Sequence, residues 1–167
     1  MYPLYIALGS NLGDRRAYLR DALQQLHLAF GAPTAVSGVY QTAAWGVTDQ
    51  PDYLNMVAAY QCDEVPLRIL RTLQKIEAAA GRVRHERWGS RTLDLDLLSY
   101  GAYQLSTPTL TLPHPRIAVR NFVLAPLAEI APALILPGLR KSVAELYAAS
   151  SDPLAVRLVE GVEDLGA

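Results

Sequence analysis

The feature that most constrains the fold of this chain is a repeated switch between two hydrophobic periods. Apolar residues recur at helical spacing in two segments and crowd or alternate, as in strands, in four others. The helical segments are residues 12–30 and 64–80, and the extended segments are residues 2–8, 34–41, 54–61 and 92–100. The resulting order, strand–helix–strand–strand–helix–strand, is that of the split βαβ or ferredoxin-like plan. The sequence therefore predicts an α+β fold, a mainly antiparallel sheet with helices packed on one face and additions at the C-terminal end.

Glycine and proline set the expected boundaries of these elements. Gly9, Ser10 and Asn11 are expected to form a turn and the cap of the first helix, which Gly31 ends. Pro66 fits the first turn of the second helix. A hairpin turn is expected at Gly101, with residues 110–112 returning as a short strand. A helix over residues 119–130, interrupted or kinked by a proline, and a last short helix over 142–149 complete the expected elements.

Length and charge place the chain among small globular proteins. Its 167 residues fit one domain, 1–167. The net charge of −1 provides no global field for nucleic acid. Cys62 is the only cysteine, so no internal disulfide can form, and a packed thiol is expected. Without a signal-like N-terminus or an apolar run of about 20 residues, a cytoplasmic protein is expected.

The sharpest local pattern is a pair of acids inside an expected strand. Asp94 and Asp96 are two residues apart, so both carboxylates should project from one face while the leucines between and around them face the other way. Like charges at such positions repel each other. Mg²⁺, which accepts oxygen ligands from one or two carboxylates and from phosphates, would relieve that repulsion. A solvent-facing edge strand would also explain the pair.

An arginine-rich segment directly precedes these acids. Arg82, Arg84, Arg87 and Arg91 fall within ten residues. Guanidinium groups suit bidentate contacts with phosphate. Cations beside metal-binding carboxylates are the usual equipment for phosphoryl transfer. A solvated basic loop is the alternative, and the spacing alone does not separate the two.

Several motifs resemble one known family. The motifs are GSNLG at 9–13, DQPDYLN at 49–55, GRVR at 81–84, RWGSRTLDLD at 87–96, LPHP at 112–115 and RNF at 120–122. In this order and spacing they resemble the hydroxymethyl-dihydropterin pyrophosphokinase family, over residues 4–140. The resemblance implies an enzyme of folate biosynthesis that transfers a diphosphate from ATP to 6-hydroxymethyl-7,8-dihydropterin, with AMP as the other product.

The resemblance also implies roles for single residues. It implies that Asp94 and Asp96 bind two Mg²⁺ ions and that Arg82 and Arg91 stabilise charge on the transferring diphosphate. The implied ATP-binding residues are Gln74, Glu77, Arg84, Leu97, Thr111, His114 and Arg120. The implied pterin-binding residues are Thr42, Trp45, Tyr53, Asn55, Trp88 and Phe122. A flat ring stacked between two aromatic side chains is a physical reason for Trp88 and Phe122. The implied partners are these two small molecules, with no nucleic acid and no membrane, and the protein is expected to be a monomer.

The sequence departs from the family pattern at three places. Ala43 and Ala44, followed by Trp45, stand where many relatives carry two prolines. Thr109 replaces a frequent arginine, and Pro115 replaces an aromatic residue after the histidine. These departures are expected to alter affinities for pterin and ATP, while the reaction stays the same.

Two other functions remain as alternatives. Ferredoxin-like sheets also bind RNA, but no expected strand carries the aromatic pattern of such modules. A Mg²⁺-dependent phosphohydrolase could use the same aspartates. Dependence of AMP production on the pterin would distinguish the transferase from the hydrolase.

Overall fold

The computed structural model describes residues 1–43, 51–81 and 92–166. Its elements, in chain order, are β1 (Tyr2–Ser10), α1 (Arg15–Phe30), β2 (Ala35–Val36), β3 (Val39–Thr42), β4 (Tyr53–Cys62), α2 (Pro66–Ala79), β5 (Asp94–Tyr100), β6 (Leu105–Ser106), β7 (Thr111–Leu112), the 3₁₀ helix η1 (Ile117–Val119), α3 (Asn121–Ile130), α4 (Val143–Ala148), β8 (Val156–Glu160) and α5 (Val162–Leu165).

One sheet organises the described part of the chain. Its strands lie in the order β5–β1–β4–β3–β8, β2 also pairs with β4, and every one of these pairings is antiparallel. Counting β2 and β3 as one interrupted strand, the first four positions follow the ferredoxin-like order. The α+β prediction and the mainly antiparallel sheet are therefore confirmed.

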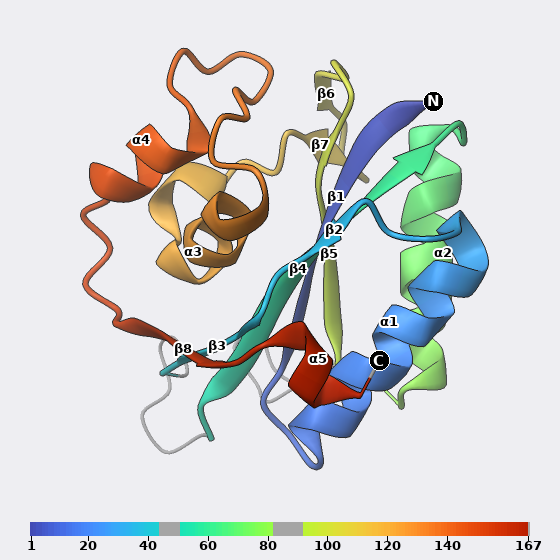
Figure 1. Ribbon diagram of the computed structural model, residues 1–167. Helices are drawn as coiled ribbons and strands as arrows, with labels where there is room; N and C mark the ends of the chain where they lie inside the picture. The colour runs from blue at the N-terminus through green and yellow to red at the C-terminus, as the bar shows by residue number, and fades with distance from the viewer. Residues whose placement is uncertain (44–50, 82–91, 167) are drawn as a thin grey trace.

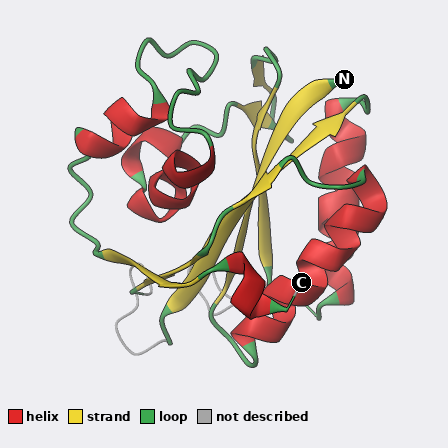
Figure 2. Ribbon diagram, viewed as in Figure 1, coloured by secondary structure: helices red, strands yellow, loops and turns green. Residues whose placement is uncertain are grey.

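Helices cover both faces of this sheet, which corrects the prediction that they pack on one. In Figures 1 and 2, α1 and α2 lie on one side of the strands and α3 and α4 on the other. The reason lies in the strands, because both of their faces are apolar. Leu4, Ile6 and Leu8 of β1 belong to the core beneath α1 and α2, while Tyr5 and Ala7 pack into a second core beneath α3.

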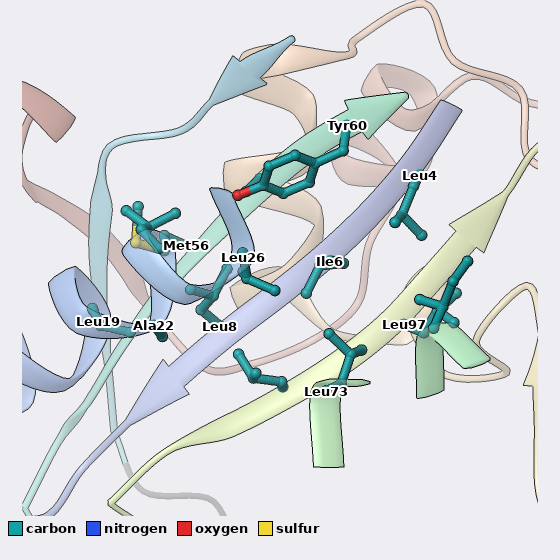
Figure 3. Close-up of a cluster of buried hydrophobic side chains, with 14 of the residues drawn as sticks. Leu4, Ile6, Leu8, Leu19, Ala22, Leu26, Met56, Tyr60, Leu73 and Leu97 are labelled. Atoms are coloured by element: carbon teal, nitrogen blue, oxygen red, sulfur yellow. The ribbon is translucent and has the colours of Figure 1, made fainter. Parts of the chain in front are cut away.

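The first core is the larger of the two. Figure 3 shows side chains from β1, β4 and β5 meeting those of α1 and α2, among them Ile6, Leu26 and Leu73. Each of these three side chains is at most 1 % exposed. Burying a large aliphatic side chain contributes about 1.5–3 kcal/mol. This core therefore fixes the sheet on which the polar residues of the other face are arranged.

The first helix begins later than the sequence indicates. Gly9 and Ser10 still belong to β1, and Asp14 is the N-cap, since its carboxylate accepts a hydrogen bond from the Ala17 amide at 3.1 Å. Leu12, expected on the apolar stripe of the helix, precedes it and is exposed. Gly31 ends the helix as predicted.

The expected strand over residues 34–41 is interrupted. Ser37 and Gly38 separate β2 from β3, and the buried Ser37 hydroxyl accepts a hydrogen bond from the Val57 amide at 2.9 Å. The Gly38 amide donates to the Glu129 carboxylate of α3 at 3.1 Å. The Ser37 amide still donates to the Val57 carbonyl at 2.9 Å, so side-chain acceptors replace only part of the ladder at this point. A pattern of apolar residues does not reveal this.

The turn expected at Gly101 and the short strand expected at 110–112 are both present, since the Tyr103 amide donates to the Tyr100 carbonyl at 3.0 Å and β7 spans Thr111–Leu112. The expected hairpin pairing is wrong, because Thr111 and Leu112 pair with β6 in a separate two-stranded sheet. The pairing of β1 with β5 shifts register between Tyr5 and Ile6. Strict alternation would place Leu98 and Tyr100 on the same face, but Leu98 lies in the second core while Tyr100 lies with Leu97 in the first. A bulge of this kind breaks the strict alternation on which the expected pattern depends.

The C-terminal part contains more structure than predicted. Pro126 lies inside α3 without ending it, because Val123, Leu124 and Leu127 are buried and hold the helix against the sheet. The helix α4 is not the last element: β8 follows, pairs with β3 and extends the sheet, and α5 lies beyond it. Within the described residues, the helices are too short or too polar for any to span a bilayer.

Candidate active site

A row of paired residues crosses one face of the sheet near the C-terminal end of β1. Gly9 pairs with Asp94 of β5 on one side and with Asn55 of β4 on the other. Side chains of residues paired in this way project to the same face. That face carries Val57 and Leu98 of the second core, so it is the face covered by α3. Asp94 and Asn55 therefore lie on either side of Gly9 on the same sheet face.

The acidic pair has the geometry expected from its spacing. Asp94 and Asp96 are half-buried, whereas Leu95 and Leu97 are buried in the first core on the opposite face. Asp96 pairs with Ala7 and Asp94 with Gly9, so the neighbouring strand presents only small residues beside the carboxylates. Both carboxylates thus lie on the α3 face, beside residues of β1 with short side chains or none.

The Asn55 amide is held in a fixed orientation. Its Nδ2 donates a hydrogen bond to Oγ1 of Thr42 at 2.9 Å, and both residues are buried, with exposures of 6 % and 3 %. Oδ1 points the opposite way: it lies 3.0 Å from the position that a Cβ atom on Gly9 would occupy. The ring of Tyr53 comes within 3.8 Å of the same position. An amide oxygen and an aromatic ring therefore lie against the backbone of Gly9.

His114 lies beside β5 and is neutral at pH 7. Its amide donates to the Leu98 carbonyl at 2.8 Å, and its Nδ1 accepts a hydrogen bond from the Arg116 amide at 3.2 Å. Burial, and secondarily Arg120 and Arg116, lower the pKa of His114 to about 4, although Asp94 acts in the opposite direction. With Nδ1 accepting, the proton of the neutral ring resides on Nε2.

Arg120 and Phe122 lie at the beginning of α3. The Arg120 guanidinium lies 5.4 Å from the centroid of the Phe122 ring, at cation–π distance. Burial and then Arg116 lower the pKa of Arg120, while Asp96, Asp94 and Asp152 raise it. Arg120 is thus within the electrostatic range of the acidic pair and is ordered against an aromatic ring.

Glu77 connects α2 to the edge strand β5. Its carboxylate accepts a hydrogen bond from the Leu95 amide at 2.9 Å, between the two aspartates, and the residue is 6 % exposed. Gln74, one turn earlier on α2, is exposed, and Thr111 lies half-buried in β7, which contacts β5. Leu97 differs from these, because its side chain is buried in the first core and faces away from the aspartates.

The other residues expected at the site lie outside the described residues. They are Arg82, Arg84 and Arg91 from the arginine-rich segment, Trp88 within it, and Trp45.

The sequence patterns did not indicate the contributions that two residues make to this region. Gly9, assigned to a turn, is a strand residue whose missing side chain allows the Asn55 amide to approach closely. A glycine inside a strand pattern is a known sign of close approach and could have indicated this. The second residue is Asp152, which accepts a hydrogen bond from the amide of Asn121. No local pattern indicates it, since 31 residues separate the partners.

The fold and this arrangement define a small α+β enzyme with carboxylates, an oriented amide and cationic side chains at one end of an antiparallel sheet. The chain belongs to the 7,8-dihydro-6-hydroxymethylpterin-pyrophosphokinase family, whose model matches residues 5–132. The family resemblance seen in the motifs is thereby confirmed, and with it the prediction of a pyrophosphokinase of folate biosynthesis.

Individual relatives agree with this assignment. The chain is 43 % identical over 163 residues to the 2-amino-4-hydroxy-6-hydroxymethyldihydropteridine pyrophosphokinase of Methylorubrum extorquens, covering 96 % of this chain and 100 % of that protein. It is 48 % identical over 127 residues to the Bacillus subtilis protein of the same name, covering 75 % and 76 %.

A solved structure supports the fold. The wild-type HPPK-DHPS of Plasmodium falciparum matches with a TM-score of 0.73 at 12 % identity. The match covers 88 % of this chain and 44 % of that longer chain. At this identity the likeness concerns the fold alone.

Proposed function

We propose that this chain transfers the terminal diphosphate of ATP to the hydroxymethyl group of 6-hydroxymethyl-7,8-dihydropterin, giving AMP and the pterin diphosphate. The observation that carries the proposal is the row Asp94–Gly9–Asn55 on one sheet face, in a chain of the pyrophosphokinase family. An acid that suits metal-bound phosphate and an amide that suits a heterocycle lie two strands apart. Neighbouring strands are about 4.8 Å apart, so the two groups are separated by about 10 Å, on either side of β1.

The pterin is proposed to bind at the Asn55 end of the row. Thr42 holds the Nδ2 side of the amide, so Oδ1 is available to accept a hydrogen bond from the pterin edge. Tyr53 borders the same position, and Phe122 supplies an aromatic face for stacking. A buried amide selects this ligand because a wrong heterocycle would leave its hydrogen bonds unmade. Trp88 and Trp45 are proposed to complete this site.

Asp94 and Asp96 fit Mg²⁺, and two ions are proposed here together with ATP. The chemistry of the donors agrees, since both are carboxylates on one face beside small residues. Among the described residues, no cluster of three or more acidic, histidine or cysteine side chains could enclose a metal alone. A pair of carboxylates that leaves positions for water and phosphate is typical of magnesium sites in phosphoryl transfer. Bound there, the ions would neutralise phosphate charge.

The nucleotide is proposed to lie along β5 and the start of α3. Neutral His114 offers an Nε2–H donor, and Arg120 offers a guanidinium within range of the acidic pair. The proposed ATP-binding residues are Gln74, Glu77, Arg84, Leu97, Thr111, His114 and Arg120, with Leu97 contributing through its backbone because its side chain faces the opposite core. For Glu77 a structural role accompanies this one, because it holds the strand between the aspartates in place. Arg82 and Arg91 are proposed to stabilise charge on the transferring diphosphate.

The proposed reaction is an in-line displacement. The pterin hydroxyl oxygen bonds to the β-phosphorus, the bond from that phosphorus to the oxygen shared with the α-phosphate breaks, and AMP leaves. The hydroxyl proton is released to solvent. The residues named above bind and orient both substrates, and no covalent bond to the protein is required.

The test is an assay of AMP and pterin diphosphate with ATP, Mg²⁺ and the reduced pterin. AMP formation that requires the pterin and yields the diphosphate supports the transferase. AMP or ADP formation at the same rate without the pterin would support a phosphohydrolase instead.

We also propose that residues 1–167 act as one domain and as a monomer on these small molecules. Equilibrium sedimentation checks the second point.

A further inference from the structure

We infer that Asp152 is a positioning residue for this site, because its carboxylate fixes the first turn of α3, which carries Arg120 and Phe122. The inference rests on the proposed function. Asp152 lies beyond residues 5–132, the part of the chain that the family model matches.

The carboxylate of Asp152 connects two segments distant in sequence. Its Oδ2 accepts a hydrogen bond from the Asn121 amide at 2.8 Å, and its Oδ1 accepts one from the Leu154 amide at 3.0 Å. The Asp152 amide donates to the Ser150 hydroxyl at 3.2 Å. Both carboxylate oxygens are therefore engaged, one by α3 and one by the segment that carries Asp152. An orientation with two such bonds leaves the side chain little freedom.

The helix α3 depends on this contact because it lacks a cap of its own. The first amides of a helix need acceptors from outside it, and a negative charge there is stabilising. Asp14 supplies the acceptor for α1, and Ser142 with Glu145 supplies it for α4, each from the adjacent sequence. Within the described part of the chain, Arg120 at the N-cap of α3 makes no side-chain capping bond, and the first turn contains no acid. Asp152 supplies that acceptor from 31 residues away.

The anchored amide lies between the two residues that the site uses. Asn121 separates Arg120, proposed to contact ATP, from Phe122, proposed to stack on the pterin. Because the Arg120 guanidinium lies over the Phe122 ring, a shift of this turn would move both side chains together. Asp152 also acts on Arg120 electrostatically, together with Asp94 and Asp96. The position of both Arg120 and Phe122, and the electrostatic environment of Arg120, thus depend on Asp152.

A purely structural cap would affect stability without affecting the site, and the chain offers a matched control for this distinction. Ser142 caps α4 by accepting a hydrogen bond from the Glu145 amide at 3.2 Å. Ser142→Ala therefore removes a helix cap of the same kind from a helix that carries none of the proposed site residues. Comparing this variant with Asp152→Ala separates loss of a cap from loss of the site's geometry.

The experiment measures kcat and KM for pterin and for ATP in the wild type, Asp152→Ala, Asp152→Asn and Ser142→Ala. We expect Asp152→Ala to raise KM for the pterin about tenfold while kcat changes much less, since supporting residues typically act on a site at this level. Asp152→Asn keeps one acceptor oxygen and should give a smaller rise in the pterin KM. Ser142→Ala should leave both KM values at the wild-type level, even if its melting temperature falls as far as that of Asp152→Ala.

Each outcome decides one question. An active wild type whose Asp152→Ala variant matches Ser142→Ala in both KM values would overturn the inference alone. A wild type that makes no AMP would remove the proposed function, and the inference with it. If Asp152→Ala does not fold, the comparison of Asp152→Asn with Ser142→Ala decides, and equal pterin KM values there would equally overturn the role of Asp152.

Discussion

Asn55 donates a hydrogen bond to Oγ1 of Thr42 at 2.9 Å, from strand β4 to the adjacent end of β3, in a buried environment. This bond sets which side of the amide faces Gly9. A carboxamide can rotate so that its oxygen and nitrogen exchange places. A hydrogen-bond partner at the nitrogen therefore also fixes where the oxygen points. The selectivity proposed for the pterin site therefore depends on the Thr42 hydroxyl, which acts by orienting Asn55 and needs no contact of its own with the substrate.

The first prediction concerns that hydroxyl. Thr42→Val keeps the shape of the side chain but removes the acceptor, so the Asn55 amide loses its orientation. An unsatisfied buried donor should lower the free energy of unfolding by about 1–3 kcal/mol. Pterin affinity should fall as well, as measured by titration with an ATP analogue present. Thr42→Ser restores the acceptor and is the control. Wild-type pterin affinity in Thr42→Val would contradict this role of the hydroxyl.

The second prediction concerns the glycine between the two groups. In Gly9→Ala the new Cβ would lie 3.0 Å from Oδ1 of Asn55 and would push on the amide that is proposed to bind the pterin. Replacing glycine by alanine within a strand is otherwise favourable by about 0.5–1 kcal/mol. The Asn55 amide must shift to admit the Cβ, which offsets this gain, so pterin binding should weaken while the free energy of unfolding stays close to the wild-type value. The check is a pterin titration beside a urea unfolding curve, and parallel losses in both would mean that the strand itself is disturbed.

The third prediction concerns the acidic pair. Asp94→Asn and Asp96→Asn should each lower turnover by several orders of magnitude at ordinary Mg²⁺ concentration, because the charge that binds the cation is lost. The fold should survive, since the change relieves repulsion between the carboxylates. Steady-state AMP formation and circular dichroism measure the two effects. Near-wild-type turnover in either variant would exclude its carboxylate from the metal site.

The fourth prediction follows from the lowered pKa of His114. The folded protein binds this proton only near pH 4, whereas the unfolded chain binds it near 6.5. Between these values the unfolded state carries more protons, so stability declines as the pH falls from 6.5 to 4. The contribution of neutral His114 to stability is fully present above pH 6.5. His114→Gln should show a flatter decline between pH 6.5 and 4 in urea unfolding. An identical slope in the variant and the wild type would show that His114 is not held neutral.

Much of this protein was predictable from local sequence. The helical and extended segments, the antiparallel α+β plan and the common face of Asp94 and Asp96 follow from periods of two and 3.6 residues. Gly31 and Pro66 marked helix boundaries for stereochemical reasons that hold wherever they occur. The motifs from GSNLG to RNF identified the family, because a long run of specific residues in fixed order carries information that periodicity lacks.

Tertiary structure decided how those parts combine. It brought Gly9 between Asp94 and Asn55, placed α3 on the face opposite α1 and α2, and bound Asp152 to Asn121. It also inserted the bulge at Leu98 and the interruption at Ser37. The physical reason is one of range. A period, or a cap from the adjacent sequence, involves residues a few positions apart. A pairing register or a contact across 31 residues depends on segments that meet only when the sheet buries its apolar faces.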